Sequence, residues 1–290
     1  MLRFLILPAL LLLSCNPKAQ NSPSNEGELK VQFSLPKKLK EVSGIALSKD
    51  KKIIWVIEDR GNKNAVYGIN DKGEMLAKVP VENSENTDWE DIISDSQGNI
   101  YIGDFGNNDN NRTDLAILKT DLTSGTQTTT KVVQTTKFHY QGQTEFPPKK
   151  SKLLYDCEAF VEMDGNFYLF TKNRSKGFDG TFLVFQVPNK GGDFEAKLIG
   201  TLKLQGGYND AAITSATINS TKDKIVLLTH KNVHVLTGFT ANDFSFAKIQ
   251  KISLNHNSQK EAIVFLDDKT VMIADEKGKD EGGNVYTFSF

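Results

Sequence analysis

Short runs of β-forming residues recur along the chain from residue 28 onward, and almost no segment has helical periodicity. Each recurring unit starts with a small or acidic residue and a small apolar pair, and then passes through a polar turn. It ends in a run rich in Ile, Val, Phe and Tyr, and these runs are Ile53–Asp59, Ile100–Asp104, Phe167–Thr171, Ile225–Thr229 and Val271–Asp275. The pattern predicts an all-β fold made of one repeated supersecondary unit.

The small or acidic residue at the start of each unit marks the spacing of the repeats. These five marker residues are Ser43, Glu90, Glu158, Ser215 and Glu261, separated by 47, 68, 57 and 46 residues. The intervals are close to the roughly 40–50 residues of a four-stranded propeller blade. Each unit has room for two further strands, as at Ala65–Ile69 and Glu74–Val81 in the first and Thr181–Val187 and Ala196–Leu204 in the third.

The two ends of the repeated region complement each other. The last unit stops after its third strand, Val285–Phe290, whereas a spare strand, Leu29–Leu35, precedes the first unit. If the spare strand pairs as the outer strand of the last blade, no sheet edge stays open to aggregation. The sequence therefore predicts a five-bladed β-propeller with four strands per blade, closed by its N-terminal strand, in one domain of residues 28–290. The alternative is a sixth blade within the 68-residue interval.

The N-terminus has the pattern of a secretion signal. Arg3 is followed by an apolar run, Phe4–Leu13, that is too short for a membrane-spanning helix, which needs about 20 residues. Its end, Leu12-Leu13-Ser14-Cys15, resembles a bacterial lipobox, so we expect cleavage after residue 14 and acylation of Cys15. Acyl chains would anchor the protein to the cell envelope outside the cytoplasm, at the outer membrane, through a flexible tether of residues 15–27. The alternative is an ordinary signal peptide in which Cys15 has no role.

Composition narrows the function classes. The chain has 35 basic and 36 acidic residues, a net charge of −1, and no basic block, which argues against binding nucleic acid. Two cysteines are too few for a disulfide framework or a zinc site built from Cys. With Cys15 as an anchor, Cys157 is interpreted as a small buried residue rather than a catalytic thiol. We expect the protein to be a monomer.

The five marker residues also predict a site, because the first strand of each propeller blade lines the central axis. The carboxylates of Glu90, Glu158 and Glu261 would repel one another there unless a cation or water compensates them. Ca²⁺ suits such a place, since it accepts oxygen ligands in loose geometry, and the hydroxyls of Ser43 and Ser215 complete the predicted set. The alternative is a ring of hydrogen bonds between neighbouring strands and channel water, without metal.

Further acids end the second strand of several units, at Glu58-Asp59, Asp104 and Asp275-Glu276. They should face one mouth of the propeller, either as a cation-lined ligand site or as a solvated rim. His230 and His234 lie on a strand and hairpin without an evident third ligand, so they do not predict a zinc site.

These motifs resemble known families. Ser43-Gly44, the segment Ile57-Glu58-Asp59-Arg60-Gly61, the marker order and Gly103-Asp104-Phe105-Gly106 resemble the five-bladed calcium-activated nucleotidases, or apyrases. The Glu-Val-Ser-Gly-Ile opening is similar to SdiA-regulated, YjiK-like bacterial lipoproteins. Asp88-Trp89-Glu90-Asp91-Ile92 with Gly103-Asp104 resembles the phytase-like esterase repeats of secreted bacterial proteins.

The resemblance to apyrases implies roles for individual residues. Asp59, with Glu90 and the calcium ion, would place the attacking water, and a group of basic residues with Asp104 would meet the substrate phosphate: Arg60, Lys172, Arg174 and Lys231. Two functions thus remain open. One is a calcium-structured propeller that binds a small molecule or protein at one mouth. The other is a calcium-dependent phosphohydrolase at the same mouth, which the acidic segment Asp275 to Glu281 would oppose, because its substrates are anionic.

Overall fold

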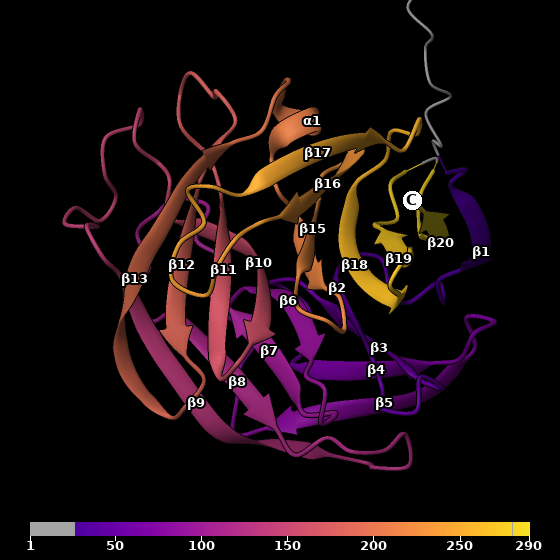
Figure 1. The fold of residues 1–290 in the computed structure, drawn as a ribbon. Helices are drawn as coiled ribbons and strands as arrows, with labels where there is room; N and C mark the ends of the chain where they lie inside the picture. The colour runs from indigo at the N-terminus through magenta and orange to yellow at the C-terminus, as the bar shows by residue number, and fades with distance from the viewer. Residues whose placement is uncertain (1–26, 280) are drawn as a thin grey trace, which may run out of the picture.

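The computed structural model describes residues 27–279 and 281–290 of the chain (Figure 1). Nearly all regular structure in these residues is β-strand, with one short helix, α1 (Tyr208–Ala211). None of the helical structure in this part of the chain is long and apolar enough to cross a membrane. The predicted signal peptide and Cys15 lie outside the described residues, so the lipid anchor stays a prediction.

Antiparallel pairing joins the strands in groups of four. The first group is β2 (Val42–Leu47), β3 (Ile54–Glu58), β4 (Ala65–Ile69) and β5 (Met75–Glu82). The second is β6 (Trp89–Ser94), β7 (Ile100–Asp104), β8 (Ala116–Thr120) and β9 (Thr130–Tyr140). The third is β10 (Asp156–Met163), β11 (Asn166–Lys172), β12 (Thr181–Pro188) and β13 (Gly192–Lys203). The fourth is β14 (Ser215–Ile218), β15 (Lys224–Leu228), β16 (Asn232–Thr237) and β17 (Lys248–Ser253). The last is β18 (Lys260–Asp267), β19 (Thr270–Asp275), β20 (Asn284–Ser289) and β1 (Lys30–Ser34).

The strands predicted from the sequence are confirmed to within a few residues at their ends. The segment 65–69 has the predicted bounds, and β1 pairs antiparallel with β20. The 68-residue interval between the second and third markers contains the eleven-residue strand β9 and a loop at 141–155. In the described chain that loop has no strand of its own. Short parallel pairings of β9 with β5 and β13 join the first three groups into one twelve-stranded sheet.

The groups are arranged around a common centre. Figure 1 shows the last strand of each group, β5, β9, β13, β17 and β1, around the outside, with the labelled first strands nearer the middle. Neighbouring first strands contact one another in chain order, and β18 contacts β2. Hydrophobic clusters fill the spaces between consecutive groups. Trp55 and Trp89 belong to the cluster between the first two, whereas Ile54 and Met272 belong to the one between the first and the last.

One position at the centre is occupied by small residues on four of the five first strands. The residue after each marker is Gly44, Ala159, Ala216 or Ala262, and on β6 it is Asp91. The buried Asp91 carboxyl group accepts hydrogen bonds from Ile92 N (2.9 Å), Ser215 Oγ (3.3 Å) and Phe160 N (3.4 Å). This side chain therefore ties β6 to β10 and β14.

The close approach of β2 to β6 requires glycine at position 44. A Cβ atom placed on Gly44 would lie 2.6 Å from Ile92 N and 3.0 Å from Asp91 Cα, both of which are backbone atoms. We therefore expect Gly44→Ala to lower the free energy of unfolding by about 2 kcal/mol, because the backbones must separate. Urea denaturation followed by circular dichroism measures this change.

Gly191→Ala is the matched control, since its nearest new contact is Gln134 Cγ at 3.6 Å. It should change the free energy of unfolding by less than about 0.5 kcal/mol. Equal effects of the two substitutions would contradict the close packing of β2 against β6.

Candidate functional site

Four of the five marker residues lie on β-bulges. The pairing of the first strand with the second shifts by one residue at Ser43, Glu90, Glu158 and Glu261. A bulge leaves one residue outside the regular alternation of a strand and changes the direction of its side chain. The repeated sequence position thus corresponds to a repeated backbone irregularity. Ser215 differs, because it begins β14 without such a shift.

The bulges bring their side chains to a polar cavity of about 140 Å³, here called the axial cavity. Its lining residues all have polar or charged side chains: Ser43, Asp59, Glu90, Asn108, Glu158, Lys172, Arg174, Glu261 and Glu276. Four of the predicted calcium ligands are among them, and so are three further residues implied by the apyrase resemblance, Asp59, Lys172 and Arg174. Five carboxyl groups face two cationic groups in this small space.

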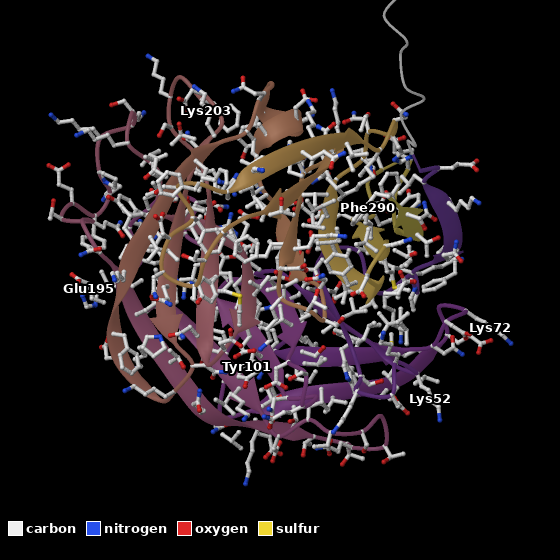
Figure 2. The ribbon with its side chains drawn as sticks, in the orientation of Figure 1. Lys52, Lys72, Tyr101, Glu195, Lys203 and Phe290 are labelled. Atoms are coloured by element: carbon white, nitrogen blue, oxygen red, sulfur yellow. The ribbon has the colours of Figure 1, made fainter. Side chains whose placement is uncertain are left out.

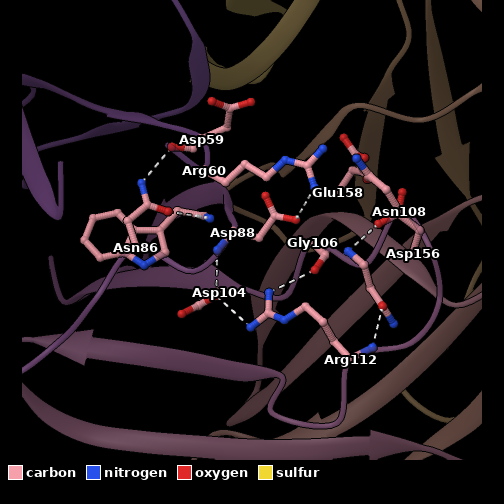
Figure 3. Close-up of polar contacts among 12 residues, drawn as sticks. Asp59, Arg60, Asn86, Asp88, Asp104, Gly106, Asn108, Arg112, Asp156 and Glu158 are labelled. Atoms are coloured by element: carbon pink, nitrogen blue, oxygen red, sulfur yellow. Dashed lines mark hydrogen bonds and ion pairs between the residues drawn. The ribbon is translucent and has the colours of Figure 1, made fainter. Parts of the chain in front are cut away.

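The remaining predicted residues have other places. Ser215 donates to Asp91 below the cavity, as described above. Asp104 receives a hydrogen bond from Arg112 Nη2 (3.0 Å) and another from Asp88 N (3.1 Å), so it fixes the turn after β7 (Figure 3). Arg60 has a side chain that is 57% exposed and lies 3.7 Å from Asp88. Arg60 and Lys231 are both absent from the cavity lining.

The two cations of the axial cavity are already paired with carboxylates. Lys172 Nζ lies 2.9 Å from Glu158 Oε2, and Arg174 Nε lies 2.6 Å from Asp156 Oδ2. Arg174 also bonds Glu158 through Nη2. Burial raises the pKa of Glu158, but Lys172 and Arg174 more than offset this effect and leave the pKa below its usual value. These four side chains, here called the compensated cluster, lie on β10, at the end of β11 and just beyond it. Within the cluster, burial and the charge of Glu158 still raise the pKa of Asp156 to about 7.

Two other acids of the cavity, Asp59 and Glu276, have no Lys or Arg ion pair in the part of the chain that the structure describes. Burial raises the pKa of Asp59 to about 7, and the charges of Glu41 and Asp88 contribute to the rise. Burial raises the pKa of Glu276 to about 8, with contributions from Glu261 and Asp59. Each group would hold its proton near neutral pH unless a positive charge replaced it.

Glu90, which also lines the axial cavity, has a raised pKa as well. Burial raises its pKa well above the usual value, and the charges of Glu158 and Asp88 raise it further. A Cβ atom on Gly106 would overlap Glu90 Oε1 and lie 2.5 Å from Asp88 Oδ2, so glycine is needed there for both carboxyl groups to approach the chain. The segments Asp88–Ile92 and Gly103–Gly106, which the sequence analysis singled out, therefore lie against each other here.

Glu276 was absent from the predicted ligand set, although the sequence contained a signal for it. It follows β19 just as Asp59 follows β3, and the pairings of β2 with β3 and of β18 with β19 put the two residues in equivalent register. His230 has the corresponding place after β15 and lies 3.0 Å from Glu261 through Nε2. The residue after the second strand thus supplies a further acid to the cavity in the first and last groups, whereas Phe105, after β7, belongs to a hydrophobic cluster.

The predicted calcium set is only partly available for a cation. Glu158 is held by Lys172 and Arg174, and Ser43 Oγ donates to Trp89 O (2.8 Å). Among the described residues, no group of three or more His, Cys, Asp or Glu side chains is spaced to hold a metal ion. The oxygen donors without a cationic partner, Asp59, Glu90 and Glu276, are nevertheless of the type that Ca²⁺ prefers. These carboxyl groups fit a hard cation, but only Glu90 of the three belongs to the predicted calcium set.

Comparison with known proteins defines the fold. No family model matches the sequence, and no curated protein matches it. Among solved structures, the PQQ-bound aldose sugar dehydrogenase from Streptomyces coelicolor, a β-propeller protein, is similar with a TM-score of 0.52 and 10% identity, over 92% of this chain and 99% of that one. The chain is a β-propeller. A gluconolactonase from Xanthomonas campestris, XC5397, is similar with a TM-score of 0.49 and 11% identity, over 91% of this chain and 90% of that one.

The compensated cluster predicts a stability effect of Lys172. Lys172→Met should lower the free energy of unfolding by about 3 kcal/mol, because the buried Glu158 loses one of its two cationic partners. The control is Lys203→Met, which breaks the exposed pair with Asp179 (2.9 Å) on the outer surface (Figure 2). That change should cost less than about 1 kcal/mol in the same urea denaturation. A Lys172 effect no larger than the control would show that Glu158 does not depend on it.

The raised pKa values predict a dependence of stability on pH. Because the folded state keeps protons on Asp59 and Glu276 that the unfolded state releases, the free energy of unfolding should fall as pH rises from 6 to about 8 in the presence of chelator. Asp59→Asn should make this fall shallower, since the amide does not ionise. Urea denaturation at several pH values gives the slope. The exposed Glu195→Gln is the control and should keep the slope of the unmodified protein; equal slopes for Asp59→Asn and the unmodified protein would refute the raised pKa.

Proposed function

We propose that the protein is a lipid-anchored, extracytoplasmic β-propeller that binds a calcium ion and a ligand in the axial cavity. In this proposal the propeller has five blades of four strands, spans residues 28–290 and is closed by β1 in the last blade. Support comes from the antiparallel groups, the hydrophobic clusters between consecutive groups and the contact of β18 with β2. Cys15 would carry the lipid and residues 15–27 the tether.

The observation that carries the cation proposal is the uncompensated charge of the axial cavity. Asp59, Glu90 and Glu276 line one small space, and each has a pKa raised by burial and by other carboxyl groups. A divalent cation would remove this repulsion when the three groups ionise. Ca²⁺ takes six to eight oxygens, so ligand oxygens would complete its coordination. Perturbed carboxyl groups gathered in a cavity are also typical of functional sites.

The arrangement favours binding over phosphate hydrolysis. A phosphohydrolase needs free Lys or Arg groups around the developing negative charge. Here Lys172 and Arg174 are committed to Glu158 and Asp156, and Arg60 is an exposed side chain beside Asp88. An anionic phosphate would instead meet the surplus acids. A ligand that brings neutral or singly charged oxygen donors to the bound cation suits the cavity better.

Thermal unfolding with calcium and with chelator tests the cation site. At a calcium concentration 100-fold above Kd, mass action stabilises the folded state by about 2.7 kcal/mol, which raises Tm by roughly 5 °C. Glu90→Gln should abolish most of this rise, because the amide removes a charge from the centre of the cavity. Calcium binding should also release protons, measured by calorimetry in buffers of different ionisation enthalpy.

The exposed residue Glu195 provides the matched control, since its side chain projects from the outer surface (Figure 2). Glu195→Gln should keep the full calcium response. An identical Tm with calcium and with chelator in the unmodified protein would overturn the cation site. Phosphate release assayed over nucleotides and phosphate esters separates the two functions: calcium-dependent turnover that is lost in Glu90→Gln would replace the binding proposal with the hydrolase.

A further inference from the structure

A second cavity lies beyond the small-residue layer, on the side away from the axial cavity. It has a volume of about 510 Å³ and is lined by the later residues of all five first strands, together with the turns that follow them. The axial cavity is lined by residues before this layer, such as Ser43 and Glu158, whereas this one begins at Ile45 and Val161. We call it the distal cavity. The layer that contains Gly44 and Asp91 separates the two.

The walls of the distal cavity differ chemically from those of the axial cavity. Aliphatic side chains that keep partial exposure line it from several first strands: Ile93 on β6, Ile218 on β14, and Val264 and Leu266 on β18. Aliphatic groups left in contact with water inside a concave site gain free energy when an apolar molecule covers them. The volume lies within the roughly 300–1,000 Å³ of small-molecule sites. Polar and charged residues make up 13 of the 24 lining residues, and most of them lie in the turns at the rim.

The charged residues at the rim are engaged in local contacts. Asp95 accepts hydrogen bonds from Gln97 N and Asn99 N, and Asp267 accepts them from Lys269 N and Thr270 N. These carboxylates hold the turns that form the rim.

Two of the three lysines of the rim are engaged in the same way. Lys51 Nζ donates to Leu266 O (2.6 Å), and Lys222 Nζ pairs with Asp164 (2.8 Å). Because these groups are used to shape the mouth, they favour neither an anionic nor a cationic ligand.

We propose that the distal cavity is a second binding site, which takes an electrically neutral small molecule with a mainly apolar body. The site is independent of the calcium proposal, since it shares no lining residue with the axial cavity. The two mouths of one propeller would then bind ligands of opposite chemistry.

The neutral fluorophore N-phenyl-1-naphthylamine tests this site in the whole folded protein. Its emission should rise on titration with saturation at one molecule per chain. Ile93→Glu should weaken its binding at least tenfold, because an ionised carboxylate would be desolvated beside an apolar ligand. Ser94→Phe, which fills space at the same wall without removing a core side chain, should weaken it by a similar factor. If Ile93→Glu lowers Tm strongly, Ser94→Phe decides.

Two controls locate the binding. Val133→Glu changes a 52% exposed apolar residue on β9, outside the cavity, and should leave the affinity for the fluorophore unchanged. Glu90→Gln in the axial cavity should do the same. Absence of saturable binding, or binding that survives both Ile93→Glu and Ser94→Phe, would overturn the proposal. So would a dimer that the fluorophore dissociates, since a second copy of the chain would then be the occupant.

Discussion

The buried carboxyl group of Asp91 is the constraint around which the centre of the propeller is built. It accepts hydrogen bonds from the backbone of β6 and β10 and from Ser215 on β14, while Gly44 leaves room for its backbone. Burial raises its pKa well above the usual value, so the hydrogen bonds are needed to offset the cost of desolvation. Because one side chain occupies the layer that small residues leave on the other strands, the axis is divided into two cavities.

The division lets the two ends of each first strand serve different chemistry. Before the layer, a bulge on four of the five first strands turns one residue toward the axial cavity, and its neighbours in space come from the end of the second strand or the residue after it. Asp59, Lys172 and Glu276 share that register position but differ in charge. Identical backbone units can thus present either a compensated cluster, around Glu158, or a surplus of acid, around Glu90. The fold fixes where these side chains lie, and the residue type at each position sets the local charge.

Periodicity made the strands and the marker positions predictable, because burial imposes alternation and turns impose their own residues. The direction of four of the five marker side chains also followed, since equivalent positions of a repeat occupy equivalent places; Ser215, which lacks the bulge, is the exception. The hydrogen-bond and ion-pair partners of the site residues could not be predicted from the repeat. That Asp104 bonds Arg112, or that Arg174 reaches both Asp156 and Glu158, depends on loops that the repeat does not constrain. The ends of the second strands did predict that Glu276 faces one mouth, but the calcium set was drawn from the starts of the first strands alone and so omitted it.

The contrast between the two halves of the axial cavity bears on why the surplus acids are there. Where Glu158 is buried, the chain supplies Lys172 and Arg174, and these two cations hold the pKa of Glu158 below its usual value. Among the described residues no such ion pair joins Asp59, Glu90 or Glu276, and their raised pKa values mean that ionising them destabilises the folded state. The same register position that supplies Lys172 to Glu158 supplies Glu276 beside Glu261, so a cation from the chain is compatible with the backbone there. A single substitution to Lys could therefore relieve this destabilisation. Local destabilisation that the sequence keeps is typical of a functional site, here one whose carboxylates bind a ligand.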